Sequence, residues 1–309
     1  MSKPSIYAIP VLGRYGLAHG LLAWARRRLW CEQTGATMLA PFWLRPRIGP
    51  YLRRERDKRA YFKLFGRGNA VAGLRRLMVL TRARRIKIGP EWPGAVTDKA
   101  QSGKKPVLVC VHNAVKDNEK KSFAQVVGHG AFLREELLAM TRPQFRPERS
   151  SAPFVAIHVR MGDFKRPSGD VAATMTNTRL PIDWYGDRLD ELRDALGQDI
   201  RALVFSDGSS AELAPLLACA NTAQAPSQAS VNDLFQIGHG ACPIASGSGF
   251  SLWGAFLGNV PRLSYLGHSI LPIYTDRSRD IESRFGTKIP TTFVGHVQER
   301  LRLPEAIIA

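Results

Sequence analysis

The sequence has few cysteines, and it contains no long apolar run. Its four cysteines are scattered over 309 residues with neither a CxxC pair nor the spacing of a metal site, which argues against a disulfide scaffold or a zinc module. No stretch of about 18 apolar residues is present, which argues against a membrane-spanning helix. The first residues, MSKPSIYAIPVLGRYG, lack the layout of a signal peptide. We therefore expect a cytoplasmic protein with reduced thiols.

Several well-known functional motifs are also missing. There is no GxGxxG dinucleotide fingerprint, no GxSxG nucleophile elbow and no DxD motif, and no set of His, Asp and Glu has the spacing of metal ligands. We therefore expect no cofactor and no essential divalent ion, and a serine hydrolase is disfavoured.

Acidic residues are scarce relative to basic ones. The chain has 26 Asp and Glu against 44 Lys and Arg, a net charge of +18. Residues 45–87 alone hold fifteen Lys and Arg against Glu55 and Asp57. Such a surface attracts phosphate-rich partners: nucleic acid, anionic lipid or a nucleotide. The plainer interpretation is a solvated, arginine-rich helical face. Aromatic residues are sparse in this stretch and no nucleic-acid-binding motif is recognisable, so we expect no nucleic-acid partner.

What is present is an alternation of strand and helix patterns, beginning at the N-terminus. A strand is predicted at 5–12 and a long helix at 17–34, with Arg26, Arg27 and Arg28 exposed and Gly35 ending it. A second strand at 36–40 completes the opening of a Rossmann-like unit.

The pattern continues through the basic stretch. We predict a helix through 70–85, a buried strand within 105–114 and helix again in 122–141, as one long helix or a helical hairpin. The polar, proline-bearing segment 142–151 is the best linker candidate. We place a domain boundary near residue 150.

The second half repeats the alternation more cleanly. Strands are predicted at 154–159, 201–205, 243–245 and 261–266, the last being the final strand, and helices at 184–196, 211–218, 232–239 and 250–257. Strands separated by helix-length segments indicate a parallel sheet covered on both faces. The expected fold is α/β, with two Rossmann-like domains, 1–150 and 151–309, facing a cleft.

Polar residues follow a strand in the segment FVAIHVRMGDF, residues 154–164. His158 and Arg160 alternate and so point the same way. The guanidinium fork of Arg160 matches phosphate oxygens and stays charged at any working pH. The alternative is a salt bridge from Arg160 to Asp163 or to another carboxylate.

A serine- and glycine-rich turn, residues 246–251, precedes an apolar helix. Its amides and hydroxyls can cradle a phosphate at the helix start, although an ordinary N-cap has the same composition. Asp207 at a strand end and Asp233 at a helix start are ambiguous in the same way. We expect Arg160 and this turn to meet on one diphosphate.

Together these segments resemble the fucosyltransferase superfamily of bacterial α-1,2-fucosyltransferases and protein O-fucosyltransferases. HVRMGD at 158–163 is similar to the family's HxRxGD element, and VFSDGSS at 204–210 to its second element. DLFQIGHGACPIASGSGFSLWGAFLG at 233–258 resembles the third, and GRYGLAHGLLA at 13–23 the N-terminal GRFGNQ-type loop. The chain departs from the family at Met161, where many members have a second arginine, and at Leu17 and Ala18, which replace asparagine and glutamine.

The resemblance implies a GT-B-like, metal-independent, inverting glycosyltransferase that transfers fucose from GDP-fucose to a glycan hydroxyl. It implies that Arg160 contacts the β-phosphate. Inversion requires a base for the acceptor's proton, for which Asp163 and His19 are the candidates, and the alternative for Asp163 is a structural role that caps the turn after the strand. The residues it implies on the donor side are His158, Arg160, Asp207, Asp233, Ser248, Gly249, Phe250 and Ser251. On the acceptor and sugar side they are Gly13, Arg14, Tyr15 and Gly16.

Three alternatives to this function stay open. The chain could be a degenerate nucleotide- or glycan-binding protein, or a transferase that uses another GDP-sugar. The acceptor could be a lipid-linked glycan, in which case the basic stretch would contact an anionic membrane peripherally at its inner face.

Overall fold

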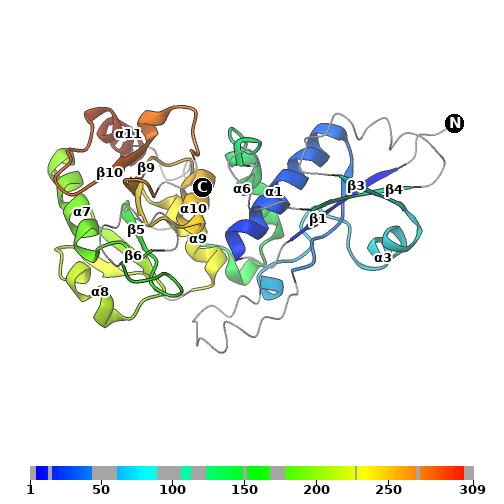
Figure 1. Cartoon of the computed structure of the whole chain (residues 1–309), viewed down its shortest axis with the longest axis horizontal. Helices are drawn as coiled ribbons and strands as arrows, with labels where there is room; N and C mark the ends of the chain where they lie inside the picture. Colours follow the sequence, from blue (N-terminus) through cyan, green and yellow to red (C-terminus); the bar gives the residue numbers. More distant parts are fainter. Residues whose placement is uncertain are drawn as a thin grey trace. The chain divides into compact units, whose positions relative to one another are not determined.

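The computed structural model describes nine stretches of the chain: residues 5–12, 16–43, 61–88, 106–112, 123–148, 152–167, 178–226, 228–268 and 272–302. These stretches form two compact units, one ending at Gln144 and the other beginning at Phe145 (Figure 1). Within the described stretches, no helix combines the length and the apolar character needed to cross a membrane.

The first unit is built on a parallel sheet of four strands in the order β2-β1-β4-β3. Its elements are β1 (Ile6–Val11), α1 (Leu17–Thr34), β2 (Thr37–Met38), η1 (Tyr61–Lys63), α3 (Gly73–Arg82), β3 (Arg84–Ile88), β4 (Val107–His112) and α6 (Gly130–Met140). Tyr7 of β1 pairs with Leu108 of β4, so the two central strands are far apart in sequence. The parallel α/β architecture predicted for this half is confirmed.

Helix α1 has its predicted bounds, and Gly35 ends it in the left-handed conformation at φ 68°. The predicted exposure of its arginines is wrong. Arg26 and Arg27 are only 5% and 6% exposed, and Arg28 pairs with Glu136 of α6 at 2.8 Å. The Arg26 Nε donates to the Gln125 side chain at 2.6 Å. Buried arginines are stable only with such partners, which come from residues about a hundred positions away in the chain.

Two further differences lie in the first unit. The helix predicted through residue 85 ends at Arg82, because the next residues form strand β3 at the sheet edge, where Arg84 pairs with Val107. In the 122–141 segment, Gly128 adopts φ 85°, and α6 begins only at Gly130.

The second unit is built on a parallel sheet of six strands in the order β10-β9-β8-β5-β6-β7. Its elements are η2 (Pro143–Phe145, at the junction of the units), β5 (Val155–Val159), α7 (Ile182–Leu196), β6 (Ala202–Ser206), α8 (Ser210–Leu217), β7 (Thr222–Gln224), α9 (Ser230–His239), β8 (Cys242–Ala245), α10 (Gly249–Gly258), β9 (Arg262–Tyr265), η4 (Arg277–Arg279), β10 (Asp280–Ser283) and α11 (Thr291–Arg302). From the central strand β5 the chain adds β6 and then β7 on one side. It then returns to the other side of β5 and adds β8, β9 and β10 in turn. This is the doubly wound Rossmann order, and it confirms the predicted fold of this half.

Two strands and one α-helix of the second unit were not predicted: β7, β10 and α11. Strand β10 makes the prediction of 261–266 as the final strand wrong. Asp280, at the start of β10, forms an ion pair with the buried Arg262 of β9 at 2.8 Å. This polar pairing hides β10 from a search for apolar runs.

The sheet of the second unit is covered on both faces. Val155, Ile157 and Val159 of β5 pack into a core with residues of α7, α8 and α11, whereas Phe154 and Ala156 pack with Ile237 of α9 on the other face. Because side chains alternate along a strand, His158 lies on the same face as Ala156. The polar end of β5 is thereby directed toward the α9 and α10 layer.

Helix α10 lies against α9 at close range. A Cβ atom on Gly258 would overlap the backbone of Gly238, so neither helix could hold this position with a larger residue there. This contact fixes where α10 lies, and with it the position of its N-terminus beside β5.

Candidate functional site

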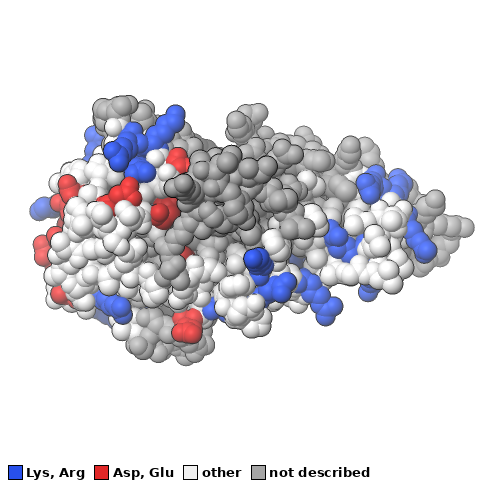
Figure 2. All heavy atoms as spheres, turned by 90° about the horizontal axis from the view of Figure 1, so that it is seen from below, with Lys and Arg blue, Asp and Glu red and all other residues white. Residues whose placement is uncertain are grey.

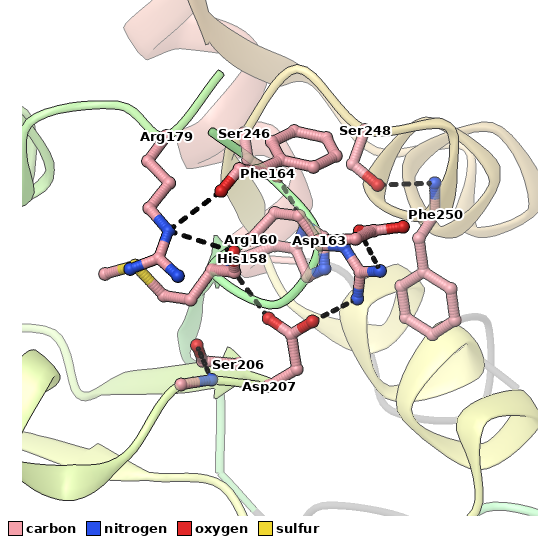
Figure 3. Close-up of polar contacts among 12 residues, drawn as sticks. His158, Arg160, Asp163, Phe164, Arg179, Ser206, Asp207, Ser246, Ser248 and Phe250 are labelled. Carbon is pink, nitrogen blue, oxygen red and sulfur yellow. Dashed lines mark hydrogen bonds and ion pairs between the residues drawn. The ribbon is translucent and has the colours of Figure 1, made fainter. Parts of the chain in front are cut away.

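Three strand ends of the second unit bring their polar residues to the same edge of the sheet. Arg160 directly follows β5, Asp207 directly follows β6 and Ser246 directly follows β8 (Figure 3). Strands β5 and β8 are neighbours, and the strand order reverses between them. In open α/β sheets a ligand binds at such a point, outside the carboxyl ends of the strands.

Two carboxylates hold the guanidinium of Arg160. Its Nη1 forms an ion pair with Asp207, and its Nη2 lies 2.7 Å from Asp163 Oδ1. The salt-bridge alternative for Arg160 is therefore realised, twice over. The Arg160 side chain remains 27% exposed, and the strand that precedes it, β5, pairs with β8, which precedes the turn. A cation held in this way is oriented without being buried.

Asp207 also fixes the loop that carries Arg160. Its second oxygen accepts a hydrogen bond from the Met161 amide at 2.8 Å. A Cβ atom on Gly162 would overlap the Asp207 carboxylate, so a larger residue there would shift this carboxylate from its present position. Asp207 thus holds both the backbone and the side chain of the loop after β5.

Arg179 fastens the same loop from the other side. Its Nε donates to the carbonyls of Met161 and Phe164 at 3.0 and 3.1 Å, and its Nη1 donates to Glu212 at 2.9 Å. Hydrogen bonds from Ser209, followed by Arg179, lower the pKa of Glu212. Arg179 was not predicted from the sequence, because an isolated arginine in a polar stretch carries no local signal.

His158 connects the ends of β5 and β8. It is 6% exposed, its Nδ1 shares a hydrogen bond with Ser246 Oγ at 2.8 Å, and its ring stacks on Phe250 at a centroid distance of 5.4 Å. Burial, and secondarily the positive charge of Arg160, lower the pKa of His158 to about 4. The ring is therefore neutral at physiological pH, and it adds no charge to the site.

The turn after β8 contains an N-cap. Ser248 Oγ accepts from the Phe250 amide at 3.2 Å, which caps α10. Ser251 is fully buried, and its hydroxyl donates to the carbonyls of Ser246 and Ser248 at 3.2 and 3.1 Å. This hydroxyl holds the turn together from inside, and the donor-side role of Ser251 stays a prediction.

The remaining predicted residues lie elsewhere. Half-buried Asp233 is in the first turn of α9, which follows β7 and so begins at the same edge of the sheet. His19, on α1, and Gly16, its N-cap, belong to the other unit. Gly13, Arg14 and Tyr15 lie outside the described residues. Over the described part of the chain, no three His, Cys, Asp or Glu residues are grouped so that they could hold a metal ion.

Comparisons with known proteins give only distant matches. No family model and no curated protein matches the chain. Among solved structures, fucosyltransferase NodZ from Bradyrhizobium matches at 14% identity and a TM-score of 0.44, over 86% of this chain and 98% of NodZ. POFUT1 in complex with GDP matches at 12% and 0.44, over 85% and 98%. The spinosyn forosaminyltransferase SpnP matches at 14% and 0.32, over 99% and 94%. Likeness at this level establishes no function for this chain.

Proposed function

We propose that the protein is a metal-independent, inverting glycosyltransferase that transfers fucose from GDP-fucose to a glycan hydroxyl. The observation that carries the proposal is the position of Arg160. It is a partly exposed, carboxylate-held cation at the point where the strand order of a parallel sheet reverses, and it lies beside the N-terminus of α10 (Figure 3).

The chemistry needs positive charge at the leaving group. When the bond between the sugar and the diphosphate breaks, negative charge develops on the β-phosphate, and a positioned cation stabilises it more strongly than it stabilises the bound donor. The guanidinium of Arg160 and the N-terminal end of α10 supply this charge without a divalent ion. The guanidinium has five N–H groups, so a phosphate oxygen can bind beside the two carboxylates.

Asp163 and Asp207 differ in how firmly they hold Arg160. Asp163 is 38% exposed and lies three residues away on the same loop, whereas Asp207 is 22% exposed and also binds the Met161 amide. We infer that the diphosphate displaces Asp163 while Asp207 stays in place. Once displaced, the Asp163 carboxylate can accept the proton of the acceptor hydroxyl. The oxygen of that hydroxyl bonds to the sugar as the bond between the sugar and GDP breaks. His19 is the alternative base.

The other residues take their proposed roles from the family resemblance. Neutral His158 and Asp233 would hold the guanine and ribose, and Asp207, Ser248, Gly249 and Phe250 would line the donor site. Residues 151–309 would form the nucleotide-sugar domain. Residues 1–150, with Gly13, Arg14, Tyr15 and Gly16, would serve the acceptor, a glycan either free or lipid-linked. We propose that the protein works in the cytoplasm.

A second candidate function has one observation in its favour. Leu17 replaces the family's asparagine, and it is only 4% exposed, with its amide donating to the Tyr61 hydroxyl at 3.0 Å. A buried leucine offers a sugar no polar side-chain contact at this position. This favours a transferase for another GDP-sugar, or a protein that binds the nucleotide without transferring a sugar.

The test has two stages. Thermal-shift measurements with GDP, UDP, ADP and CMP should show stabilisation by GDP above the others, because a ligand of the folded state raises its stability by about 2.7 kcal/mol at a hundredfold excess over Kd. GDP release from GDP-fucose, measured with and without EDTA, should then proceed equally well.

Each outcome decides between the candidates. Stabilisation by GDP without release from any GDP-sugar supports the binding protein, and release only from another GDP-sugar supports the second transferase. Loss of release in EDTA would end metal independence, and no preference for GDP would contradict the proposal as a whole.

A further inference from the structure

Helix α3 exposes a stripe of apolar side chains. Leu74, Leu77 and Met78 are 73%, 56% and 41% exposed, and the spacing i, i+3, i+4 places them on one side of the helix. Only three other large apolar side chains are exposed in the described part of the chain, at Phe42, Phe62 and Phe285. Half of the exposed apolar side chains thus lie on a helix of ten residues.

The stripe is separate from the face that α3 packs against the core. Val79 is 7% exposed and packs with Tyr7, Leu39 and Leu108 of the first unit's sheet. At 3.6 residues per turn, Leu77 and Leu74 lie about 160° and 140° around the helix from Val79, and Met78 lies about 100° from it. The helix therefore has a second apolar face that folding of this unit leaves exposed.

Two exposed arginines of α3, Arg75 and Arg82, border the stripe on one side. The sequence from Tyr61 to Ile88 holds eight Lys and Arg with no Asp or Glu. On the right of Figure 2, blue side chains surround a white surface, and no red is seen among them. Two further arginines are used internally: the Arg76 Nε donates to the Ala40 carbonyl at 3.1 Å, and the Arg85 Nη2 donates to the Leu80 carbonyl at 3.0 Å.

We propose that this face of α3 docks onto an anionic lipid bilayer. Leu74, Leu77 and Met78 enter the headgroup layer, and Arg75 and Arg82 contact lipid phosphates. Helix α3 packs along the sheet of the first unit and exposes an apolar stripe with cations at its border. This arrangement is typical of a helix that lies in the interface of a membrane. The proposal does not depend on the reaction catalysed by the other unit.

Other occupants fit the surface less well. A second copy docked through the same face would bring two sets of arginines together without an acidic residue from 61–88 to pair with them. Single-stranded nucleic acid binds over aromatic side chains on which its bases stack, whereas the centre of this stripe is aliphatic.

The test is flotation of the full chain with two kinds of vesicle, phosphatidylcholine alone and phosphatidylcholine with phosphatidylglycerol at about three to one. We expect binding to the anionic vesicles alone, and its loss at high salt. Each of Arg75→Gln and Arg82→Gln should weaken binding about fivefold, from the loss of one cation near the surface. Leu74→Ser with Met78→Ser should weaken it at least about tenfold, and more strongly than either arginine variant.

The matched control is Phe285→Ser with Arg284→Gln, an exposed apolar and cationic pair of the second unit. The control should float as the unmodified protein does, and all variants should keep its circular dichroism spectrum and Tm. Equal binding to neutral vesicles, or equal losses in the control, would overturn the proposal. So would tighter binding of a single-stranded oligonucleotide or an acidic peptide than of anionic vesicles, or dimerisation through α3 in their absence.

Discussion

Strands β5 and β8 are neighbours at the point where the strand order reverses. Their ends offer an anionic ligand two different kinds of positive group. After β5 the potential is a full charge, that of Arg160, held by Asp163 and Asp207. After β8 it is the dipole of α10, whose first turn is capped by Ser248. One strand end is charged and balanced by carboxylates, whereas the other is uncharged.

The two strand ends differ in what holds the positive group in position. A flexible arginine is positioned only if other side chains orient it, and here those side chains come from two separate loops. A helix N-terminus is positioned by the packing of the helix itself, in this case by the contact of Gly258 with Gly238. Replacing Asp163 or Asp207 can therefore change the position of the Arg160 guanidinium. The N-terminus of α10 should keep its position when one side chain of the turn is replaced.

The largest effect is expected from removing the charged end. Arg160→Ala should lower transfer at least a hundredfold, about 3 kcal/mol of transition-state stabilisation, while the Tm changes little. Arg166→Ala, at an exposed arginine of the same unit, is the control and should be as active as the unmodified protein. Near-normal turnover of Arg160→Ala in a GDP-release assay would remove the proposed role.

His158 of β5, which is hydrogen-bonded to Ser246 after β8, should make the free energy of unfolding depend on pH. His158 has a pKa of about 4 when folded, below its ordinary value of 6.5, so the unfolded chain binds the extra proton between these values. Its contribution to stability is complete above pH 6.5, and roughly 3 kcal/mol should be lost as the pH falls to 4. Denaturant unfolding at several pH values measures this. His158→Gln should flatten that part of the profile, and an unchanged profile would contradict the assignment.

Asp207→Asn tests how much the orientation of the Arg160 guanidinium matters, because the variant keeps this charge and removes a carboxylate that orients it. The amide oxygen can still accept from the Met161 amide, but the ion pair with Arg160 is lost, so we expect about tenfold slower transfer from a misplaced guanidinium. The comparison is with Asp190→Asn, an exposed carboxylate near Arg193 at 3.9 Å, which should have no effect. Equal activity of both variants would mean that Asp207 does not orient Arg160.

At the dipolar end, Ser248→Ala should have a small effect. Losing the N-cap should lower the free energy of unfolding by about 1 kcal/mol and affect transfer only a few-fold, because the amides of α10 stay in place. Chemical denaturation and GDP-release rates measure the two quantities. A loss of transfer as large as that of Arg160→Ala would show that the hydroxyl, and not the helix end, binds the diphosphate.

The smallest effect on GDP binding should come from Asp163, the exchangeable partner of Arg160, although its replacement by asparagine also removes the proposed base and should slow transfer. Asp163→Asn removes a partly exposed competitor of the diphosphate, so GDP should bind up to about fivefold more tightly. Isothermal titration calorimetry measures this affinity directly. Weaker GDP binding would show instead that Asp163 holds Arg160 in its binding position.

The sequence predicted much of this site, but not its connections. The arginine at the end of β5 and the turn before α10 follow from local patterns, an apolar run that stops and a glycine-rich stretch before a helix. The pairing of Arg160 with Asp207 joins residues 47 positions apart, and it exists because β5 and β6 are adjacent in the sheet. Arg179 was missed for the same reason, since its partners are two backbone carbonyls and Glu212, which lies 33 positions further along the chain.

The sequence alone determined where most strands and helices lie, because the spacing of apolar residues and the helix-ending glycine act within a few neighbouring positions. Only the tertiary structure decided which polar residues are buried and which apolar ones are exposed. Arg26 and Arg27 are buried in the first unit, and Arg26 there meets the side chain of Gln125, whereas Leu74 and Leu77 point away from the core that Val79 joins. Burial depends on the partners that distant segments bring to a side chain, and strand order settles which segments meet.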